Sequence, residues 1–326
     1  MAAVILSLPS FSQKSELKAT LVDAVHYPAT VPPGDYSGIC WLGSNEYAVV
    51  SDKSRSDGFF IFHIDIDPSD GHITAVSSNE FRSADRPNRD QEGIAYFPAD
   101  TTIFISGEAD NKIYEYRLDT GKRTGRSLDL PDELTVSAPN YGYESLTYSP
   151  VTHLFWTTSE STLPIDGQPA SPGNKVRNKL RLLAFNDSLR FVKEYPYEMD
   201  APEVKSSSAD RYAMGVSEMC ALDDGRLLVL EREFFVPTLK IGAFVNCKIF
   251  VVDPADDLYS TSLHKKLLTQ FKTRLTGLKT NIANYEGMCL GPKLNDGRQV
   301  LVLVSDSQSQ YKKVLKDWFR TIIINS

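Results

Sequence analysis

Asp90-Gln91-Glu92-Gly93-Ile94-Ala95 has four further variants along this chain of 326 residues. Each variant has a polar or acidic residue, usually a small residue, then a large aliphatic residue and a small one, and each opens an apolar strand. The four variants are Ser37-Gly38-Ile39-Cys40, Glu144-Ser145-Leu146-Thr147, Ser217-Glu218-Met219-Cys220 and Glu286-Gly287-Met288-Cys289. Successive copies are about fifty to seventy-five residues apart, a spacing expected for propeller blades with variable loops.

A second apolar strand follows each copy and ends in an acidic residue. An acid at five equivalent places indicates a shared position in the fold. The five segments are Tyr47–Asp52, Ile103–Glu108, Leu154–Glu160, Leu227–Glu231 and Val300–Asp306.

The strand count predicts how the repeats close into a ring. Each of the first four repeats has two more strands, whereas the fifth has only Phe319–Ile324 after Asp306. The isolated strand at residues 16–25 supplies the missing one, because a ring must leave no open sheet edge. We therefore expect an all-β chain with a single β-propeller of five four-stranded blades over residues 14–326. A sixth, degenerate blade stays open as an alternative, because the loops before repeats four and five could hide strands.

Composition excludes several classes of function. The net charge of −7 argues against non-specific binding of nucleic acid, and no apolar run is long enough to span a membrane. Three of the four cysteines share one repeat position and fit small buried residues, and no CxxC spacing is present. We expect a monomer that binds a small molecule.

Residues 1–13 are interpreted as a remnant of a signal peptide or as an extension. Residues 2–11 resemble the apolar part of a secretory signal, although the positively charged segment that precedes such a part is missing. We therefore expect the protein to be exported, either to the periplasm or out of the cell.

Propeller geometry predicts that two sets of polar residues meet at one mouth of the channel. The first strand of a blade lines the channel and starts at one face, and the second strand ends at that same face. The first set is Ser37, Glu92, Glu144, Glu218 and Glu286. The second set is Asp52, Glu108, Glu160, Glu231 and Asp306.

So many carboxylates cannot converge without partners, because like charges raise one another's pKa. One candidate partner is Ca²⁺, which takes several carboxylate oxygens in flexible geometry. Another is a set of basic residues beside the acids, namely Lys53, Arg55, Arg89 and Arg232. A third interpretation is architectural, with the acids accepting hydrogen bonds from backbone amides of neighbouring blades. Tyr143 and Tyr285 suit a sugar or a phosphorylated polyol, and equally suit the covering of blade edges.

Several of these motifs together resemble the phytase-like family, also described as having esterase-like activity of phytase. The resemblance covers about residues 37–306 and includes the Glu-Gly-aliphatic motifs at Glu92 and Glu286 and the related Glu144 motif. It implies a β-propeller, export in bacteria, and a phosphoesterase or phosphodiesterase activity that depends on the repeated acids. Ser37 departs from the pattern by replacing an acid, and Glu218 is offset by one place. The acids that the resemblance singles out are Asp52, Glu92, Glu108, Glu144, Glu160, Glu218, Glu231, Glu286 and Asp306.

Common catalytic motifs are missing from the sequence, including GxSxG, HExxH and the P-loop. Our first hypothesis is a metal-assisted phosphoesterase, in which mouth carboxylates hold Ca²⁺ and one of them positions or deprotonates water. Glu92, Glu144 and Glu286 are the expected ligands or bases. The expected phosphate-binding residues are Lys53, Arg89 and Arg232. The alternatives are a non-enzymatic propeller that binds a carbohydrate or a protein, and a lactonase-type hydrolase that shares the metal.

Overall fold

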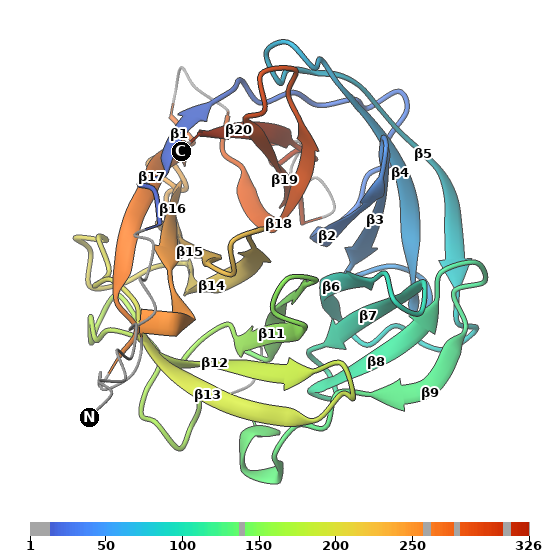
Figure 1. The fold of residues 1–326 in the computed structure, drawn as a ribbon. Coiled ribbons are helices and arrows are strands. Elements are labelled where there is room, and N and C mark those ends of the chain that lie inside the picture. Colours follow the sequence, from blue (N-terminus) through green and yellow to red (C-terminus); the bar gives the residue numbers. More distant parts are fainter. Residues whose placement is uncertain (1–13, 137–140, 257–261, 277–280, 309–313, 326) are drawn as a thin grey trace, which may run out of the picture.

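The computed structural model describes residues 14–136, 141–256, 262–276, 281–308 and 314–325. Five four-stranded antiparallel sheets form a ring, and β2, β6, β14 and β18 lie near its centre (Figure 1). The expected all-β propeller of five blades is confirmed. Residues 1–13, for which a signal remnant was expected, lie outside the described residues.

Blades 1 to 4 each run from the channel outward in chain order. Blade 1 consists of β2 (Tyr36–Gly43), β3 (Glu46–Ser51), β4 (Gly58–Ile66) and β5 (Ile73–Ser83). Blade 2 consists of β6 (Gln91–Phe97), β7 (Thr102–Gly107), β8 (Lys112–Arg117) and β9 (Arg123–Ser127). Blade 3 consists of β10 (Tyr143–Ser149), β11 (Leu154–Ser159), β12 (Lys179–Asn186) and β13 (Phe191–Glu198). Blade 4 consists of β14 (Arg211–Ala221), β15 (Leu227–Val236), β16 (Phe244–Val252) and β17 (Lys265–Arg274).

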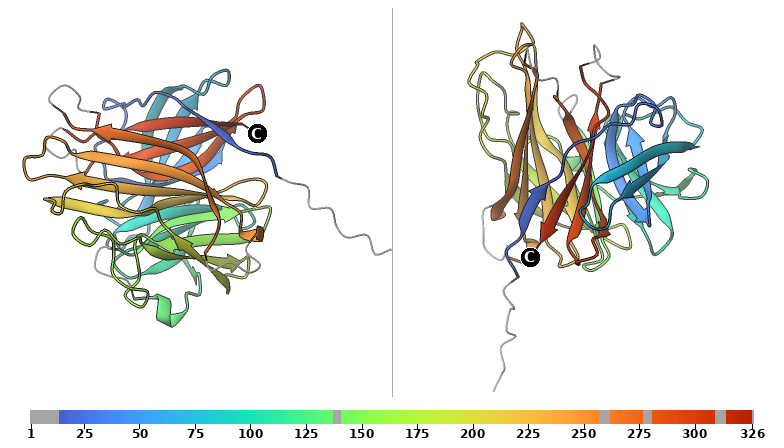
Figure 2. Two further views of the ribbon diagram at one scale, coloured as in Figure 1. Left: turned by 90° about the vertical axis from the view of Figure 1, so that its left-hand side faces the viewer. Right: turned by 90° about the horizontal axis from the view of Figure 1, so that it is seen from above.

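Blade 5 is completed by the beginning of the chain, as the strand count predicts. Its strands are β18 (Asn284–Lys293), β19 (Gln299–Asp306), β20 (Phe319–Asn325) and β1 (Lys18–Leu21). β1 pairs antiparallel with β20, from Lys18 opposite Asn325 to Leu21 opposite Ile322 (Figures 1 and 2). The pairing covers the outer edge of β20, which would otherwise present free backbone groups to other chains.

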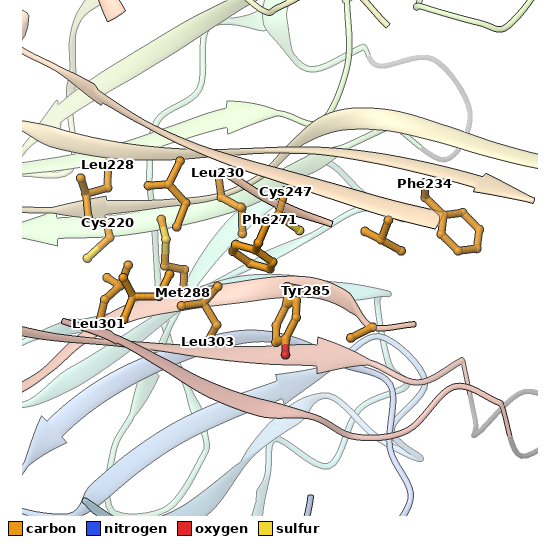
Figure 3. Close-up of a cluster of buried hydrophobic side chains, with 14 of the residues drawn as sticks. Cys220, Leu228, Leu230, Phe234, Cys247, Phe271, Tyr285, Met288, Leu301 and Leu303 are labelled. Atoms are coloured by element: carbon orange, nitrogen blue, oxygen red, sulfur yellow. The ribbon is translucent and has the colours of Figure 1, made fainter. Parts of the chain in front are cut away.

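The hydrophobic core is divided into five clusters, one between each pair of neighbouring blades. Figure 3 shows the cluster between blades 4 and 5, where Leu228 and Leu230 of β15 face Met288 of β18 and Leu303 of β19. Burying a side chain of this size contributes about 1.5–3 kcal/mol. Interfaces of this kind fix each blade against the next, and so fix the relative positions of the five inner strands.

Blade 4 rises above its neighbours on the face where the first strands begin. β14 has eleven residues and β15 has ten, whereas β10 has seven and β11 has six. The long strands of blade 4, yellow to orange in Figure 2, therefore extend past the opening of the channel. The described part of the chain contains no helix with the length and hydrophobicity needed to span a membrane.

Candidate functional site

A bulge in each inner strand places one side chain at the channel mouth. The pairing register shifts after Tyr36, Gln91, Tyr143, Val216 and Tyr285. A bulge leaves an extra residue unpaired and re-aims its side chain. The five residues at this position are Ser37, Glu92, Glu144, Ser217 and Glu286. Blade 4 therefore contributes Ser217 here, and the grouping of Glu218 with the mouth acids is corrected.

The ends of the second strands supply the other set, again with a correction in blade 4. Val216 lies opposite Glu231, just as Tyr36 lies opposite Ser51 and Tyr285 lies opposite Ser305. The residue that follows this pair turns to the mouth, and in blade 4 it is Arg232. The five equivalent residues are Asp52, Glu108, Glu160, Arg232 and Asp306. Arg232 therefore occupies the place of the expected fifth acid.

The two sets together form the acidic mouth, which we define as Asp52, Glu92, Glu108, Glu144, Glu160, Glu286 and Asp306. Arg232 is buried among them and forms ion pairs with Glu160 and Glu286. Its guanidinium also donates to Asn284 Oδ1 at 3.1 Å. The Asn284 amide in turn donates to Glu286 Oε1 at 2.8 Å and to Asp306 Oδ2 at 3.3 Å. One arginine and one amide therefore link three blades across the mouth.

Cations at the rim offset little of the remaining negative charge. Lys53 Nζ lies 2.9 Å from Asp52 Oδ2 and 3.1 Å from Asp90 Oδ1, but its side chain is 59% exposed. An exposed ion pair of this kind is worth at most about 1 kcal/mol. Asp52 Oδ1 is buried and has no hydrogen-bond partner among the described residues. Within the described residues, the ion pairs of these seven carboxyl groups involve one buried cation, Arg232, and one exposed cation, Lys53.

Burial and mutual repulsion raise the pKa values of the mouth acids. Burial has the largest effect on Glu92, and repulsion from Asp52 and Glu286 adds to it, so the pKa of Glu92 lies well above its ordinary range. Burial likewise raises the pKa of Glu144, with repulsion from Glu160 adding to it. Glu144 and Glu160 share a hydrogen bond, which requires a proton on one of them.

The acids nearest the basic residues have smaller shifts. Burial raises the pKa of Glu286 to about 7, although Arg232 opposes the shift. Burial also raises the pKa of Asp52 to about 6, against the effect of Lys53. Groups with these pKa values change protonation near neutral pH, which is the property required of a general acid or base.

Two predicted metal ligands lie away from the acidic mouth. Glu218 is one residue farther down the channel and accepts hydrogen bonds from backbone N–H groups of Leu146 and Met219, at 2.9 and 3.0 Å. Glu231 lies inside β15 rather than at its end, because the strand continues to Val236. Its carboxylate accepts from Tyr197 of blade 3 and pairs with Lys265 at the start of β17 in its own blade.

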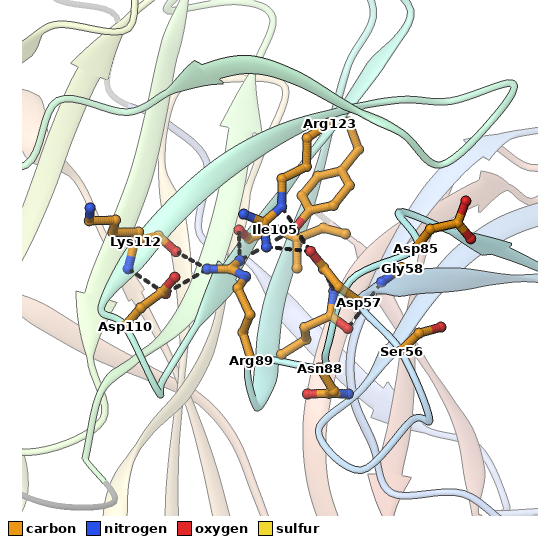
Figure 4. Close-up of polar contacts among 12 residues, drawn as sticks. Ser56, Asp57, Gly58, Asp85, Asn88, Arg89, Ile105, Asp110, Lys112 and Arg123 are labelled. Carbon is orange, nitrogen blue, oxygen red and sulfur yellow. Dashed lines mark hydrogen bonds and ion pairs between the residues drawn. The ribbon is translucent and has the colours of Figure 1, made fainter.

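Arg89 does not reach the mouth as a phosphate-binding residue would. Its guanidinium is buried against blade 2, where it pairs with Asp110 at 2.6 Å and donates to the carbonyl groups of Ile105 and Lys112 (Figure 4). A Cβ atom at Gly107 would lie 2.6 Å from its Nη1 atom, so the absence of that side chain makes room for the arginine. Arg89 therefore stabilises the blade.

Tyr143 and Tyr285, the expected substrate-binding aromatics, both pack between blades. The Tyr143 hydroxyl donates to the Leu134 carbonyl at 2.7 Å. Tyr285 lies in the cluster between blades 4 and 5, with its ring 5.5 Å from that of Phe271 (Figure 3). The other interpretation of these two tyrosines, that they cover blade edges, agrees with these positions.

Two further polar residues lie beside the acidic mouth. Asn284 lies two residues before Glu286, and the half-buried Tyr141 lies two residues before Tyr143. Burial raises the pKa of Tyr141, and the charge of Glu160 adds to the shift, so this hydroxyl lies near the acidic mouth. Residues two apart on a strand share a face, which agrees with the contact between Asn284 and Glu286.

The donor set suits a hard cation, but it is not a preformed metal site. Among residues that the structure describes, no group of three or more His, Cys, Asp or Glu side chains is arranged to hold a metal ion. The chemistry nevertheless matches Ca²⁺, which prefers carboxylate and amide oxygens. The partnerless oxygen of Asp52 and the surplus of acids are the features that a cation would satisfy.

Comparison with known families gives a match over residues 31–308 to the phytase-like family, described as "esterase-like activity of phytase". The chain belongs to the phytase-like family. The matched range contains every residue of the acidic mouth. A search of curated proteins gives no match.

Two solved structures that are similar to this phytase-like chain have low sequence identity with it. An endo-arabinase from Bacteroides thetaiotaomicron is 10% identical, with a TM-score of 0.49, over 91% of this chain and 97% of the other. A luciferin-regenerating enzyme is 11% identical, with a TM-score of 0.44, over 94% of this chain and 96% of the other. Similarity at this level carries no argument about function.

Proposed function

We propose that this protein is a metal-assisted hydrolase of phosphate esters, with its active site at the acidic mouth. The observation that carries the proposal is the convergence of seven carboxyl groups around one buried arginine. Structural ion pairs normally balance their charges, whereas this cluster has ion pairs with only two cations in the part of the chain that the structure describes. Perturbed pKa values concentrated in one cleft are typical of functional sites.

Ca²⁺ is the cofactor that we propose for this site. Asp52, Glu92, Glu286 and Asp306 would hold it, because repulsion from Asp52 contributes to the raised pKa values of the other three groups. When bound, the cation supplies a binding point for phosphate oxygens and screens their charge.

The chain's own groups then provide proton transfer and orientation. Glu286, with a pKa of about 7, is partly ionised at neutral pH and is suited to take a proton from an attacking water. Arg232 and Asn284 hold its Oε1 atom in position. Glu144 and Glu160 keep one shared proton, which one of them could donate to a leaving oxygen.

Lys53 is the basic residue best placed to meet a substrate from solvent. Its ammonium lies at the rim beside Asp52 and is largely exposed, so it can attract a phosphate without losing a buried partner. Arg232, by contrast, is held by Glu160 and Glu286 and would act on the acids rather than on the phosphate. The substrate class that we propose is a small phosphorylated molecule.

The test is turnover with Ca²⁺ and with chelator on phosphomonoesters, phosphodiesters, phytate and sugar lactones. The wild type is compared with Glu286→Gln and with Glu231→Gln, which removes a buried acid outside the mouth. We expect calcium-dependent turnover of a phosphate ester that Glu286→Gln loses and Glu231→Gln retains. Equal turnover in all three proteins, or none on any substrate, would reject the proposal.

A second candidate function is a binding propeller with an architectural mouth. It is favoured by the closed network in which Arg232 joins Glu160, Asn284 and Glu286, because this network already satisfies several mouth oxygens. The same comparison distinguishes the two functions. A folded wild type that is indifferent to Ca²⁺ and hydrolyses nothing supports the binding propeller.

A further inference from the structure

The central channel has a second chamber at the end opposite the acidic mouth. This lower chamber has a volume of about 500 Å³ and is lined by the inner strands of all five blades. Pockets for small molecules measure roughly 300–1,000 Å³. The part of its wall nearest the mouth is apolar and consists mainly of Ile39, Ile94, Leu146 and Met288.

The next position of the inner strands adds thiols to this wall. Cys40, Cys220 and Cys289 are free, buried cysteines that line the chamber. Burial raises the pKa of each thiol well above its ordinary value, so all three are uncharged near neutral pH. Ala95 holds the same position in blade 2. Because a neutral thiol behaves as a small hydrophobic group, this layer extends the apolar wall.

Thr147 holds that position in blade 3 and is the polar member of the layer. Its hydroxyl oxygen accepts the N–H group of Ala221 in blade 4 at 3.1 Å. A hydroxyl that accepts one hydrogen bond still has a proton to donate, and no acceptor for this proton is found among the described residues. Thr147 is half-buried, so a ligand in the chamber would meet a donor on an otherwise apolar wall.

The charged residues of the chamber stand at its outer rim and offset each other. Lys293 Nζ lies 3.1 Å from Asp223 Oδ2, and both side chains are mostly exposed, at 59% and 64%. A ligand with a net charge would gain one of these groups as a partner only by separating it from the other. An uncharged ligand leaves the pair intact and loses no hydration of a charge on entering the apolar chamber.

Aromatic side chains line the side of the chamber away from this ion pair. Trp41, Tyr96 and Tyr148 belong to blades 1, 2 and 3, and all three are half-buried. Aromatic rings pack favourably against one another in offset or edge-to-face arrangements. The lining therefore suits a ligand that has an aromatic ring and no net charge.

We propose that the lower chamber binds a small uncharged aromatic molecule that carries one acceptor oxygen. The ring would lie against the apolar and aromatic wall, and the oxygen would accept the hydroxyl proton of Thr147. The site is separate from the acidic mouth, and the proposal does not depend on the proposed hydrolase activity. 1-Indanone, a bicyclic aromatic ketone, is a probe of this class.

The test is a calorimetric titration of the full-length protein with 1-indanone, with the hydrocarbon indane, and with the charged analogues 1-aminoindane and indane-1-carboxylate. We expect both uncharged compounds to bind and each charged analogue to bind at least about fivefold more weakly than 1-indanone. Thr147→Val should weaken 1-indanone by about twofold to tenfold, the effect of one hydrogen bond, and should leave indane unchanged. Thr147→Ser retains the hydroxyl and should bind 1-indanone as the wild type does.

Methyl NMR of the methionines places the ligand in the molecule. The ring current of bound 1-indanone should shift the methyl signal of Met288, which lines the chamber. The signals of Met199 and Met214, which lie in the core cluster between blades 3 and 4, should not move.

Three results would overturn the proposal. The first is that neither uncharged compound binds at millimolar concentration, and the second is that a charged analogue binds as tightly as 1-indanone. The third is binding that leaves the Met288 signal unmoved. If Thr147→Val has no effect on 1-indanone, or weakens indane equally, the assigned contact between Thr147 and the ligand oxygen is refuted.

Discussion

Substitution of Glu286 by glutamine should reduce the dependence of stability on pH. The carboxyl group has an ordinary pKa of 4.5 and a folded pKa of about 7, because burial disfavours its charged form. The folded protein therefore binds the proton more tightly than the unfolded chain does. The stabilisation is fully present below pH 4.5 and is lost as pH rises through 7.

The shift corresponds to about 3 kcal/mol of unfolding free energy, at 1.36 kcal/mol for each pKa unit. Most of this, about 2–3 kcal/mol, is lost between pH 5 and pH 8, because at pH 5 the unfolded carboxyl is already partly ionised. Glu286→Gln removes this titration and also relieves repulsion on Glu92 and Asp306. The loss of stability from pH 5 to pH 8 should therefore be smaller in the variant by about 2–3 kcal/mol.

The assay is urea unfolding at pH 5, 6, 7 and 8 in the presence of chelator. The readout is the change in unfolding free energy with pH, which separates titration from any constant loss caused by the weakened contact with Arg232. Glu46→Gln, on the exposed surface of β3, is the matched control and should follow the wild type. If Glu286→Gln and the wild type change in parallel across this range, the description of Glu286 as a buried, repelled acid is refuted.

Three further predictions concern the mouth, the inner strands and the ring. Arg232→Met leaves two buried, ion-paired glutamates without their cation and should lower the unfolding free energy at pH 7 by about 3–5 kcal/mol. A loss below about 1 kcal/mol would contradict the assignment of these ion pairs. Gly38→Ala would place a Cβ atom 2.2 Å from the Glu92 carbonyl oxygen and should lower the free energy of urea unfolding by about 1–3 kcal/mol. The control Gly173→Ala, whose nearest contact is at 3.8 Å, should change this free energy little. Equal effects of the two substitutions would argue against the close approach of the inner strands. Deletion of residues 1–22 removes β1, so that β20 becomes an open sheet edge. The deletion should lower the urea concentration at the midpoint of unfolding and should produce oligomers that light scattering detects. A monomeric protein of unchanged stability would show that β1 is dispensable.

The fold could be predicted from sequence because its signals repeat. The inner-strand motif and the apolar second strand recur in every blade, so each copy supports the interpretation of the others. The missing strand of the last blade and the orphan strand at 16–25 fit the same rule, since a ring tolerates no open edge. The alternative of a sixth blade is not needed, because five sheets account for all the assigned strands.

Site residues were harder to predict because a displacement of one residue on a strand reverses the direction of a side chain. In blade 4 the strand was expected to end at Glu231, but β15 continues to Val236. The register therefore places Arg232 at the mouth and turns Glu231 toward Lys265. Strand ends are set by tertiary pairing, which the local sequence does not specify.

Proximity in sequence also misled the assignment of side chains that flank the motif. Tyr143 and Tyr285 immediately precede mouth glutamates, yet they alternate to the opposite face and pack between blades. Arg89 is three residues from Glu92, but Asp110 and the carbonyl groups of blade 2 hold it away from the channel. Neither the position of these tyrosines nor that of Arg89 can be predicted from sequence without knowing which strands lie beside them.

The most direct test of the acidic mouth is a calorimetric titration with Ca²⁺ at pH 7. The wild type should bind the cation, and Glu92→Gln and Glu286→Gln should each weaken binding at least tenfold. Glu218→Gln and Glu231→Gln, which remove buried acids outside the mouth, should bind as the wild type does. The account is contradicted if the wild type binds no Ca²⁺, or if the loss of Glu218 or Glu231 weakens binding as much as the loss of a mouth glutamate.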